Sequence, residues 1–491
     1  MRSAGNHQLN FAFADSPRGG KDAAPSGQPD GKAHLLLRAK DMRAEDPAAG
    51  EVVAEELLER IAAPANLATA LLNVARNKGA PGVDGCSIKE VVEASRLLLP
   101  KLRRALLDGS YRPGDIRRVW IPKPGGGQRG LGIPNVVDRW VQQAAHQQLE
   151  PIFEPSFHPS SHGFRPQRGA HTAIPEARRY VKEGHGHVVD IDLSKFFDRV
   201  HHQRLLSRLG QKVTDRRVLL LIKRMLTANV VMPDGMRVTT EEGTPQGGPL
   251  SPLLSNIVLD ELDQELHRRS LHFVRYADDC NIFVRSERAG LRVMASTRRF
   301  IEKRLRLVVN EEKSAVARPS ERHFLGFRLC VAEDGTVEVH LSGKAKSRMD
   351  TRIRELTPRK YGQSLPSLFA GVNQYLQGWF HYFKLVSGKG ALLMPRFDAH
   401  IRRRIRAIIV RRQKRPRFLY RHLIGRGVPP RNAAKAAWCG RGVWYRSNLP
   451  GVTRAYRNVW FHERLFCMKH HWMHLYGPPR TVSGQQLLLD L

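Results

Sequence analysis

The segment VRYADDCNIFV, residues 274–284, constrains this chain more than any other stretch of its sequence. It places two adjacent carboxylates, Asp278 and Asp279, between two short runs of β-forming residues, which predicts a β-hairpin with the acids at its tip. Adjacent half-buried carboxylates repel each other, so they persist where a cation or a raised pKa neutralises them. A hard, oxygen-seeking ion such as Mg²⁺ is the natural partner. The ordinary alternative is a solvated turn, and the rest of the chain has to decide between the two.

The net charge of the chain indicates a polyanionic partner. Among its 491 residues, 81 Lys and Arg stand against 46 Asp and Glu, which gives a formal net charge of +35. Arginine, which dominates the surplus, suits bidentate contacts with phosphates. Nucleic acid is therefore favoured over a membrane surface, since the sequence has neither an apolar run of bilayer length nor a lipidation signal.

The five cysteines form no CxxC pair, which argues against a disulfide framework and favours a reducing, cytoplasmic compartment.

The first two thirds of the chain predict a mixed helical and β structure. Residues 1–50 are rich in Gly, Pro and Ala and predict a disordered leader. Two short strands at 117–134 flank a basic, glycine-rich turn, and the apolar run VVDIDL at 188–193 predicts a buried strand. Apolar periodicity predicts helices over 51–76 with a break near Pro64, and over 138–149, 170–183, 203–228, 250–268 and 288–307. This order predicts an antiparallel sheet covered by helices on one face.

The last third is helical and basic in character. Aromatic and aliphatic residues at helical spacing predict an amphipathic helix over 365–385. Between Asp398 and Glu463 there are 17 Lys and Arg and no acidic residue. A solvated arginine-rich face is the ordinary explanation of such a run. However, these cations repel one another unless a polyanion screens them, and the aromatic residues among them offer stacking surfaces: Trp438, Trp444, Tyr445, Tyr456 and Trp460.

The run VVDIDL supplies a further candidate acid. Asp192 lies at its end, 86 positions before Asp278. If the two strands are neighbours, Asp192, Asp278 and Asp279 converge on a pair of metal ions, which can clamp the attacking and leaving oxygens of a phosphoryl displacement. Asp190 and Asp198 are competing candidates. Strand alternation puts Asp190 on the same face as Asp192, whereas Asp198 lies beyond the strand.

Several segments together resemble those of bacterial group II intron reverse transcriptases and maturases. They occur in the order of that family and cover roughly residues 55 to 330: NKGAPGVDG (77–85), IPKPGGGQRGLGIP (121–134), FEPSFHPSSHGFRPQRGAH (153–171), DLSKFFD (192–198), GTPQGGPLSPLLSNI (243–257), RYADD (275–279) and FLGF (324–327). The later string LQGWFHYF, residues 376–383, is similar to the maturase region of the family and extends the resemblance to about residue 480.

The resemblance implies an α+β fold: a right-hand polymerase with fingers, a palm built on an antiparallel sheet and a helical thumb, followed by a basic, mainly helical C-terminal region. The divisions expected after the leader are an N-terminal extension and fingers (51–175), a palm with the catalytic acids (176–345), a thumb or maturase region (346–425) and a DNA- and RNA-binding region (426–491).

The resemblance also selects among the acids. It assigns Asp192, Asp278 and Asp279 as ligands of two Mg²⁺ ions that activate the primer 3′-OH and neutralise pyrophosphate as it leaves. The backbone of Leu193 is a further candidate contact to a metal or to the triphosphate.

Five residues are expected at the nucleotide. Lys123 and Arg129 would contact the triphosphate, Phe197 would act as a steric gate against a ribose 2′-OH, Gln246 would lie near the nascent base pair, and Lys313 would protonate pyrophosphate. Their ordinary alternatives are surface charge for Lys123 and Arg129, a core aromatic for Phe197, a turn-stabilising side chain for Gln246 and an exposed helix-end lysine for Lys313.

The basic second half is expected to bind the intron RNA and the target DNA. The candidate contacts are Arg402, Arg403, Arg404, Arg406, Arg411, Arg412, Lys414 and Arg415. A zinc site at His462, Cys467, His470, His471 and His474 is a weaker alternative, because no second ligand cluster supports it. The optional HNH endonuclease of the family should show paired cysteines, so we expect the endonuclease-lacking type.

These features predict an RNA-directed DNA polymerase that binds its intron RNA, assists its splicing and copies it into cDNA during retrohoming. Its partners would be the intron RNA, the DNA target and primer, and dNTPs, with no membrane involved; its oligomeric state stays open. It would be cytoplasmic and associated with the nucleoid when on target DNA. Two alternatives are a splicing factor with an idle polymerase, which should have lost an active-site acid, and a domesticated reverse transcriptase used in phage defence, which the maturase-like part argues against.

Overall fold

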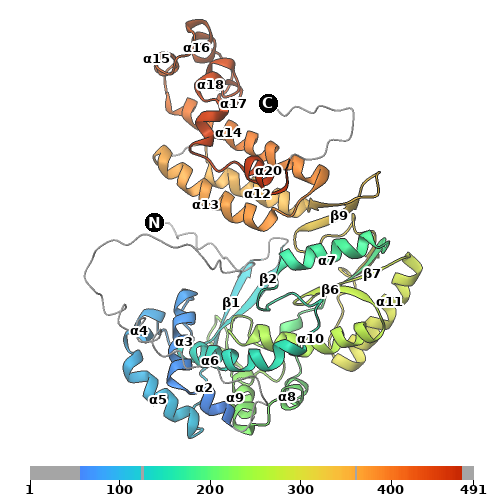
Figure 1. Cartoon of the computed structure of the whole chain (residues 1–491). Coiled ribbons are helices and arrows are strands. Elements are labelled where there is room, and N and C mark those ends of the chain that lie inside the picture. Colours follow the sequence, from blue (N-terminus) through green and yellow to red (C-terminus); the bar gives the residue numbers. More distant parts are fainter. Residues whose placement is uncertain (1–55, 123–125, 360–361, 478–491) are drawn as a thin grey trace. The chain divides into compact units, whose positions relative to one another are not determined.

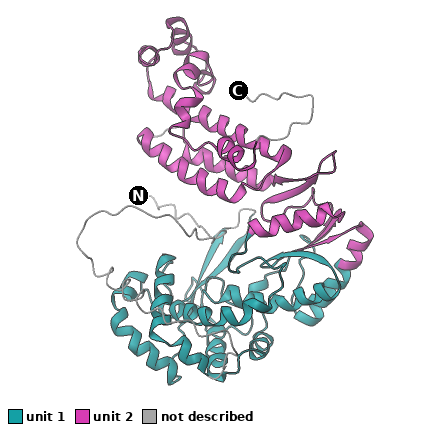
Figure 2. Cartoon of the chain, viewed as in Figure 1, with its two compact units in different colours: residues 1–169, 191–280, 294–314 teal, residues 170–190, 281–293, 315–491 magenta. Residues whose placement is uncertain are grey.

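The computed structural model describes residues 56–122, 126–359 and 362–477 (Figure 1). The predicted leader, residues 1–50, and Lys123 therefore lie outside the described residues. The chain divides into two compact units, each of which is described by itself (Figure 2). Unit 1 comprises residues 1–169, 191–280 and 294–314, and unit 2 comprises residues 170–190, 281–293 and 315–491.

Unit 1 begins with a group of helices. They are α2 (Leu57–Ile61), α3 (Pro64–Arg76), α4 (Ile88–Glu93) and α5 (Ser95–Leu107). Pro64 stands at the first position of α3, where its missing N–H leaves no helical hydrogen bond unmade, so the predicted break is confirmed. The buried face of α3 packs on α6 (Val136–Phe153), and Trp140 donates a 2.6 Å hydrogen bond to the Leu67 carbonyl.

A four-stranded sheet with the order β2-β1-β4-β5 follows in unit 1. The predicted hairpin is confirmed as β1 (Ile116–Pro122) and β2 (Gln128–Ile133), which pair antiparallel with Trp120 opposite Gly130. The short strands β4 (Val230–Val231) and β5 (Arg237–Val238) extend this sheet.

The helical prediction over 203–228 is confirmed for most of its length, with a break at residues 211–215. The structure has two helices, α8 (His202–Gly210) and α9 (Arg216–Leu226). The break arises because Asp215 caps α9: its side chain accepts a 3.0 Å hydrogen bond from Arg217 N and another from Leu58 N. The next helix, α10 (Ser251–Arg268), agrees with the prediction.

A second four-stranded sheet has the order β6-β7-β3-β8, and the boundary between the units falls within β3 and β7. The strands are β3 (His187–Ile191), β6 (His272–Tyr276), β7 (Asp279–Val284) and β8 (Ala315–Ala317). β3 and β8 pair antiparallel with Val189 opposite Val316, as predicted for this sheet. The helix predicted over 288–307 is α11 (Glu287–Phe300), continued by a π-helical turn, η4 (Ile301–Leu305).

Unit 2 contains α7 (Ala170–Lys182) and the antiparallel hairpin of β9 (Phe327–Val331) and β10 (Val337–Leu341). Arg178 on α7 donates a 2.7 Å hydrogen bond to the Val337 carbonyl. The predicted aromatic helix is α13 (Leu365–Phe383), whose buried face includes Leu368, Val372 and Leu376.

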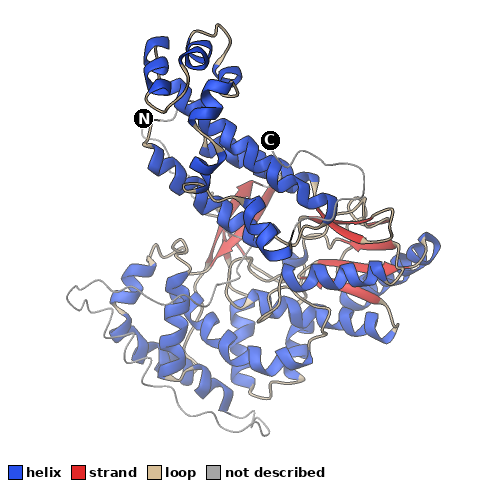
Figure 3. Cartoon of the chain, turned by 45° about the horizontal axis from the view of Figure 1, so that its top comes forward, coloured by secondary structure: helices blue, strands red, loops and turns tan. Residues whose placement is uncertain are grey.

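The part of unit 2 that follows β10 is helical in the residues that the structure describes (Figure 3). Its longer helices are α12 (Gly343–Leu356) and α14 (Leu393–Arg412), with the 3-10 turn η5 (Gly388–Leu392) before α14. Short helices follow: α15 (Pro416–Ile424), α16 (Pro430–Ala437), α17 (Val443–Arg446), α18 (Pro450–Ala455), α19 (Asn458–His462) and α20 (Met468–Tyr476). Across the described ranges, no helix has both the length and the apolar character that crossing a bilayer requires.

Candidate active site

The hairpin predicted around the adjacent acids is present, with Asp278 in its turn and Asp279 as the first residue of β7. Ala277, which precedes Asp278, has a φ of +55°, a conformation that residues other than glycine rarely adopt. The side chain of Asp278 is half-buried and that of Asp279 is exposed. The turn therefore places these two carboxylates in different environments.

Asp192 lies directly after β3, on a segment that runs beside residues 308–314. The Asp192 carbonyl accepts a 2.8 Å hydrogen bond from Asn310 N, and its own N–H donates to Ser314 Oγ at 3.0 Å. Leu193, which is buried, forms a β-bridge with Val309. These bonds fix the backbone that carries the Asp192 carboxylate. Lys313 Nζ lies 3.3 Å from Asp192 Oδ2.

Electrostatics connects Asp192 with Asp278. Burial raises the pKa of Asp278, and the negative charge of Asp192 raises it further, while the positive charges of Arg129 and Arg275 act in the opposite direction. Two repelling carboxylates gain from a cation, and an all-oxygen donor set fits a hard ion such as Mg²⁺. Within the described residues, no three His, Cys, Asp or Glu side chains are arranged as a group that could hold a metal ion. The convergence of all three acids therefore stays a prediction.

The two competing acids have cationic partners of their own. In unit 2, Asp190 Oδ2 accepts hydrogen bonds from Nε and Nη2 of Arg322, at 2.9 and 2.6 Å. In unit 1, Asp198 closes the 3-10 turn η3 (Phe196–Asp198), 4.0 Å from Arg118 Nη1. The charge of Asp192 is among the main influences on the Asp278 carboxyl, which favours Asp192 over both of them.

The predicted nucleotide contacts Arg129 and Gln246 lie together. Arg129 Nε donates a 2.7 Å hydrogen bond to Gln246 Oε1, and Gly132 N donates to the Gln246 carbonyl at 2.9 Å. This close approach requires a glycine at position 247. Gly247 has a φ of +137°, and the Cβ of any other residue there would stand 2.6 Å from the Gly132 carbonyl oxygen. These two hydrogen bonds therefore join the turn before α10 to β2.

The backbone of Phe197 is hydrogen-bonded to the same turn. Its carbonyl accepts a 2.6 Å hydrogen bond from Thr244 N, and the φ of Gly243, +97°, allows the close contact between the two segments. The ring of Phe197 is 8% exposed and packs edge-on against Phe196, with the ring centroids 5.1 Å apart. The prediction of a steric gate thus falls on a residue that lies largely in the core, with one small exposed part.

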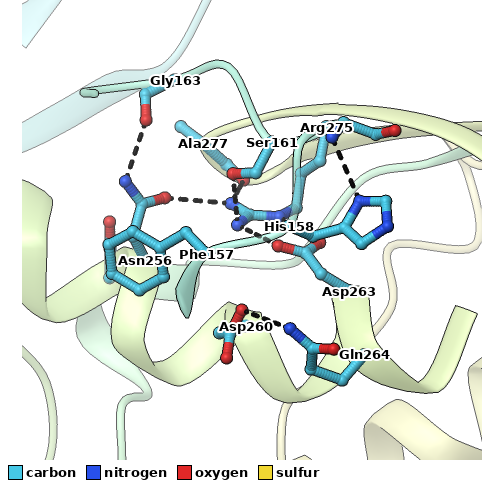
Figure 4. A network of polar contacts seen from close by, with 12 residues as sticks. Phe157, His158, Ser161, Gly163, Asn256, Asp260, Asp263, Gln264, Arg275 and Ala277 are labelled. Carbon is cyan, nitrogen blue, oxygen red and sulfur yellow. Dashed lines mark hydrogen bonds and ion pairs between the residues drawn. The ribbon is translucent and has the colours of Figure 1, made fainter. Parts of the chain in front are cut away.

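A buried polar network beside the hairpin was not predicted from the sequence (Figure 4). Arg275 on β6 is fully buried and pairs with Asp263, while a loop at 160–162 exchanges backbone hydrogen bonds with Arg275. One signal was available: Asn256 and Asp263 lie seven positions apart on α10, so they share a helix face with apolar core residues. Polar side chains on such a face imply a buried polar partner.

The eight basic residues predicted to contact nucleic acid fall into different environments in unit 2. Arg402 and Arg406 are buried, and Arg406 donates to the Tyr456 carbonyl at 3.1 and 2.8 Å; burial lowers the pKa of Arg406 to about 10. Arg403 lies over the ring of Trp444 and Arg404 bonds Thr357, both being part-exposed. Exposed side chains remain at the end of α14 and just after it: Arg411, Arg412, Lys414 and Arg415.

Two of the residues considered as a zinc alternative, Cys467 and His471, have other contacts. Cys467 donates through its Sγ to Asp398 Oδ2 at 3.3 Å, and Asp398 also accepts from the backbone of Met468 and Lys469 at the start of α20. His471 stacks on Phe466. These contacts are those of a packed helix start.

Comparison with known proteins agrees with the resemblance. The model of the reverse transcriptase (RNA-dependent DNA polymerase) family matches residues 121–329, and that of the group II intron maturase-specific domain matches residues 346–426. Protein YkfC of Escherichia coli (strain K12) is 35% identical over 56% of this chain and 83% of its own length. Group II intron-encoded protein LtrA of Lactococcus lactis subsp. cremoris is 30% identical over 51% of this chain, which spans 52% of LtrA.

Among solved structures, a telomerase from Candida albicans is similar over 61% of this chain and 59% of its own, with 12% identity and a TM-score of 0.38. That similarity is distant, and the sequence matches carry the assignment. They confirm the predicted reverse transcriptase fold and its maturase region. The chain belongs to the group II intron family of reverse transcriptases and maturases, whose polymerase is an RNA-directed DNA polymerase.

Proposed function

We propose that this protein copies a group II intron RNA into DNA at Asp192, Asp278 and Asp279, and binds the same RNA to assist its splicing. The observation that carries the catalytic part is the place of Asp278 and Asp279 at the turn of the β6–β7 hairpin, within the residues that match the reverse transcriptase family. The negative charge of Asp192, which raises the pKa of Asp278, agrees with this assignment. Carboxylates that repel each other gain from a bound divalent cation, and their oxygens suit a hard ion.

Asp192, Asp278 and Asp279 are the residues that would hold two Mg²⁺ ions, with the backbone of Leu193 beside them. The bound ions would stabilise the charge that develops on the attacking and leaving oxygens of the phosphoryl transfer. The chain itself supplies alignment, since the hydrogen bonds of Asp192 to Asn310 and Ser314 fix the backbone that carries its carboxylate.

Basic residues of unit 1 would serve the triphosphate. Arg129, which is exposed and oriented by Gln246, would pair with phosphate oxygens, as would Lys123. Lys313, whose Nζ lies beside Asp192, would donate a proton to the departing pyrophosphate. The Phe197 ring would exclude a ribose 2′-OH and so favour dNTPs.

Unit 2 would bind the intron RNA and the DNA target. The exposed cations Arg411, Arg412, Lys414 and Arg415, referred to below as the basic segment, supply contacts to phosphates. The exposed ring of Trp444 beneath Arg403 offers a stacking surface in the same unit. In this proposal the palm extends over 176–345 and the thumb or maturase region over 346–425. Retrohoming, in which the intron is copied into its DNA target, follows from the combination of these activities.

Two assays on the full chain test the proposal. Extension of a DNA primer on intron RNA, with Mg²⁺ and dNTPs, should occur with the wild type and be lost in Asp278→Ala. Splicing of a precursor RNA at low Mg²⁺ should be assisted by both proteins, because the proposed RNA-binding surface is unchanged. Equal extension by the two proteins would contradict the catalytic assignment, and splicing that neither protein assists would contradict the maturase role.

A further inference from the structure

The guanidinium of Arg275 is enclosed in the core of unit 1, next to the turn that carries Asp278 (Figure 4). An arginine has five N–H donors, and each of these has an acceptor here. The bonds are Nε to Asp263 Oδ1 at 2.7 Å, Nη2 to Asp263 Oδ2 at 2.5 Å, Nη2 to Ser161 Oγ at 2.7 Å, Nη1 to Asn256 Oδ1 at 3.1 Å and Nη1 to the Ala277 carbonyl at 2.9 Å.

The acceptors come from three segments of the chain. Asp263 and Asn256 belong to α10, Ser161 belongs to the loop before α7, and the Ala277 carbonyl belongs to the hairpin turn. The last of these bonds is the one that bears on the site. Ala277 holds a φ of +55°, which an alanine adopts only when its surroundings impose it, and the next residue is Asp278.

The turn is also confined by the loop that carries Gly163. The Asn256 side chain donates a 2.9 Å hydrogen bond to the Gly163 carbonyl while its oxygen accepts from Arg275, so one amide connects the loop to the guanidinium. Gly163 packs directly on the turn, because a Cβ there would stand 2.3 Å from Ala277 N and 3.0 Å from the Tyr276 carbonyl carbon.

Stability alone does not account for a buried ion pair of this kind. Removing two charges from water is costly, and well-packed apolar residues commonly stabilise a core as well as or better than an ion pair does. Such a network instead fixes one arrangement of the groups around it, provided that every member is satisfied, as all five donors are here. The arrangement that it fixes includes the backbone immediately before Asp278.

We propose that Arg275 is a positioning residue for Asp278, acting through its hydrogen bond to the Ala277 carbonyl and supported by Asp263 and Asn256. The inference rests on the proposed function and deepens it. Without the guanidinium, Ala277 should relax from its left-handed conformation, and the Asp278 carboxylate should move from the position that this turn gives it. Residues that orient metal ligands typically change activity or metal affinity by about 10–100-fold when they are replaced.

The test is Arg275→Lys in the full chain, measured by RNA-templated primer extension. Lysine keeps a positive charge opposite Asp263, but its three donors cannot reproduce the planar fork. We expect kcat to fall by about 10–100-fold with little change in the KM for dNTP, and activity to recover in part as Mg²⁺ is raised. This recovery is a readout that a merely structural role would not produce.

Two further variants keep the test decisive if Arg275→Lys folds poorly. Gly163→Ala disturbs the same turn from the loop side without altering the ion pair, and should show the same displaced Mg²⁺ dependence. Leu67→Ala, in the buried face of α3, removes core packing in a helix that contributes no residue to the site, and should leave the Mg²⁺ dependence unchanged.

The outcomes separate the two proposals. If Asp278→Ala is inactive but both Arg275→Lys and Gly163→Ala keep the kcat and Mg²⁺ dependence of Leu67→Ala, the positioning role is overturned and the catalytic assignment stands. If Asp278→Ala retains wild-type extension, both proposals fall.

Discussion

Arg129 Nε donates a 2.7 Å hydrogen bond to Oε1 of Gln246, which lies 117 positions further along the chain. The bond joins the hairpin of β1 and β2 to the turn before α10, and a backbone bond from Gly132 N to the Gln246 carbonyl runs beside it. Two side chains that were predicted separately to contact the nucleotide therefore form one surface. A substitution of either residue should therefore alter the position of the other side chain.

Arg129→Ala should raise the KM for dNTP with a smaller effect on kcat. Hydrogen bonds to charged groups contribute about 1.5–3 kcal/mol, which corresponds to about 10–100-fold in affinity. Gln246→Ala should have a smaller effect, and the double variant should fall short of the sum because the residues are in contact. Steady-state kinetics on a homopolymer template measures this, with the exposed Arg103→Ala as the control of equal charge change. Strictly additive effects would show that the bond does not matter to the nucleotide.

Phe197→Ala should increase the incorporation of rNTPs relative to dNTPs. The ring is expected to meet the 2′-OH, so its removal opens space for a ribose. Phe196→Ala is the matched control, since that ring is adjacent and more deeply buried, at 2% exposed against 8% for Phe197. Both variants should lose stability by about 3–5 kcal/mol, but only Phe197→Ala should change sugar selection. Unchanged selection in Phe197→Ala would leave this residue as a core aromatic.

The stability of unit 2 should depend on pH through His340. A hydrogen bond with Cys330 raises the pKa of His340 above its ordinary value, burial opposes this, and Glu338 Oε2, 2.7 Å from Nε2, raises it further. A histidine with a raised pKa in the folded state stabilises the fold fully below its ordinary pKa of about 6.5 and loses that contribution as pH rises through the folded value.

Thermal unfolding of His340→Gln should therefore show a weaker decline from about pH 6 to about pH 8 than the wild type. The difference should amount to at most about 1 kcal/mol, because the pair is only partly buried. His474→Gln, at an exposed position on α20, is the control and should follow the wild type. Parallel curves for all three proteins would exclude a role of His340 in the pH dependence.

Neutralising the basic segment should flatten the salt dependence of RNA binding. For Arg411→Gln, Lys414→Gln and Arg415→Gln combined, the slope of log K against log salt should fall by about 0.7–0.9 for each phosphate that the variant no longer neutralises. Lys101, Arg103 and Arg104, exposed on α5 in unit 1, allow a triple variant of equal charge change that should affect the slope less. Equal slopes for the two triple variants would place the RNA-binding surface elsewhere.

Local patterns were sufficient to predict much of the fold. The β1–β2 hairpin, α10, α13 and the hairpin around Asp278 follow from apolar periodicity and turn residues that act over short distances. The break at Asp215 was missed because the apolar spacing of 203–228 continues across it, and a cap that also bonds Leu58 depends on a distant segment. The strands β4 and β5, of two residues each, are too short to leave a pattern.

The sequence allowed the residues of the site to be predicted, but not how those residues are arranged. The motifs named Asp192 and Asp278, and the structure adds the electrostatic relation between them. A run of cations does not show which of its members face the core, so the burial of Arg402 and Arg406 had to come from the packing of α14. Arg275 was visible as a charge within a strand, but its partners lie on segments far away in sequence.

The most direct test of the account is single-turnover incorporation of one dNTP on an RNA template, comparing Asp278→Asn, Asp192→Asn and Asp190→Asn. These changes keep side-chain size, and Asp190, two positions before Asp192, is paired with Arg322. We predict that Asp278→Asn and Asp192→Asn lose incorporation while still binding primer and template, and that Asp190→Asn retains it. Incorporation by Asp278→Asn at the wild-type rate, or its loss in Asp190→Asn alone, would contradict the account.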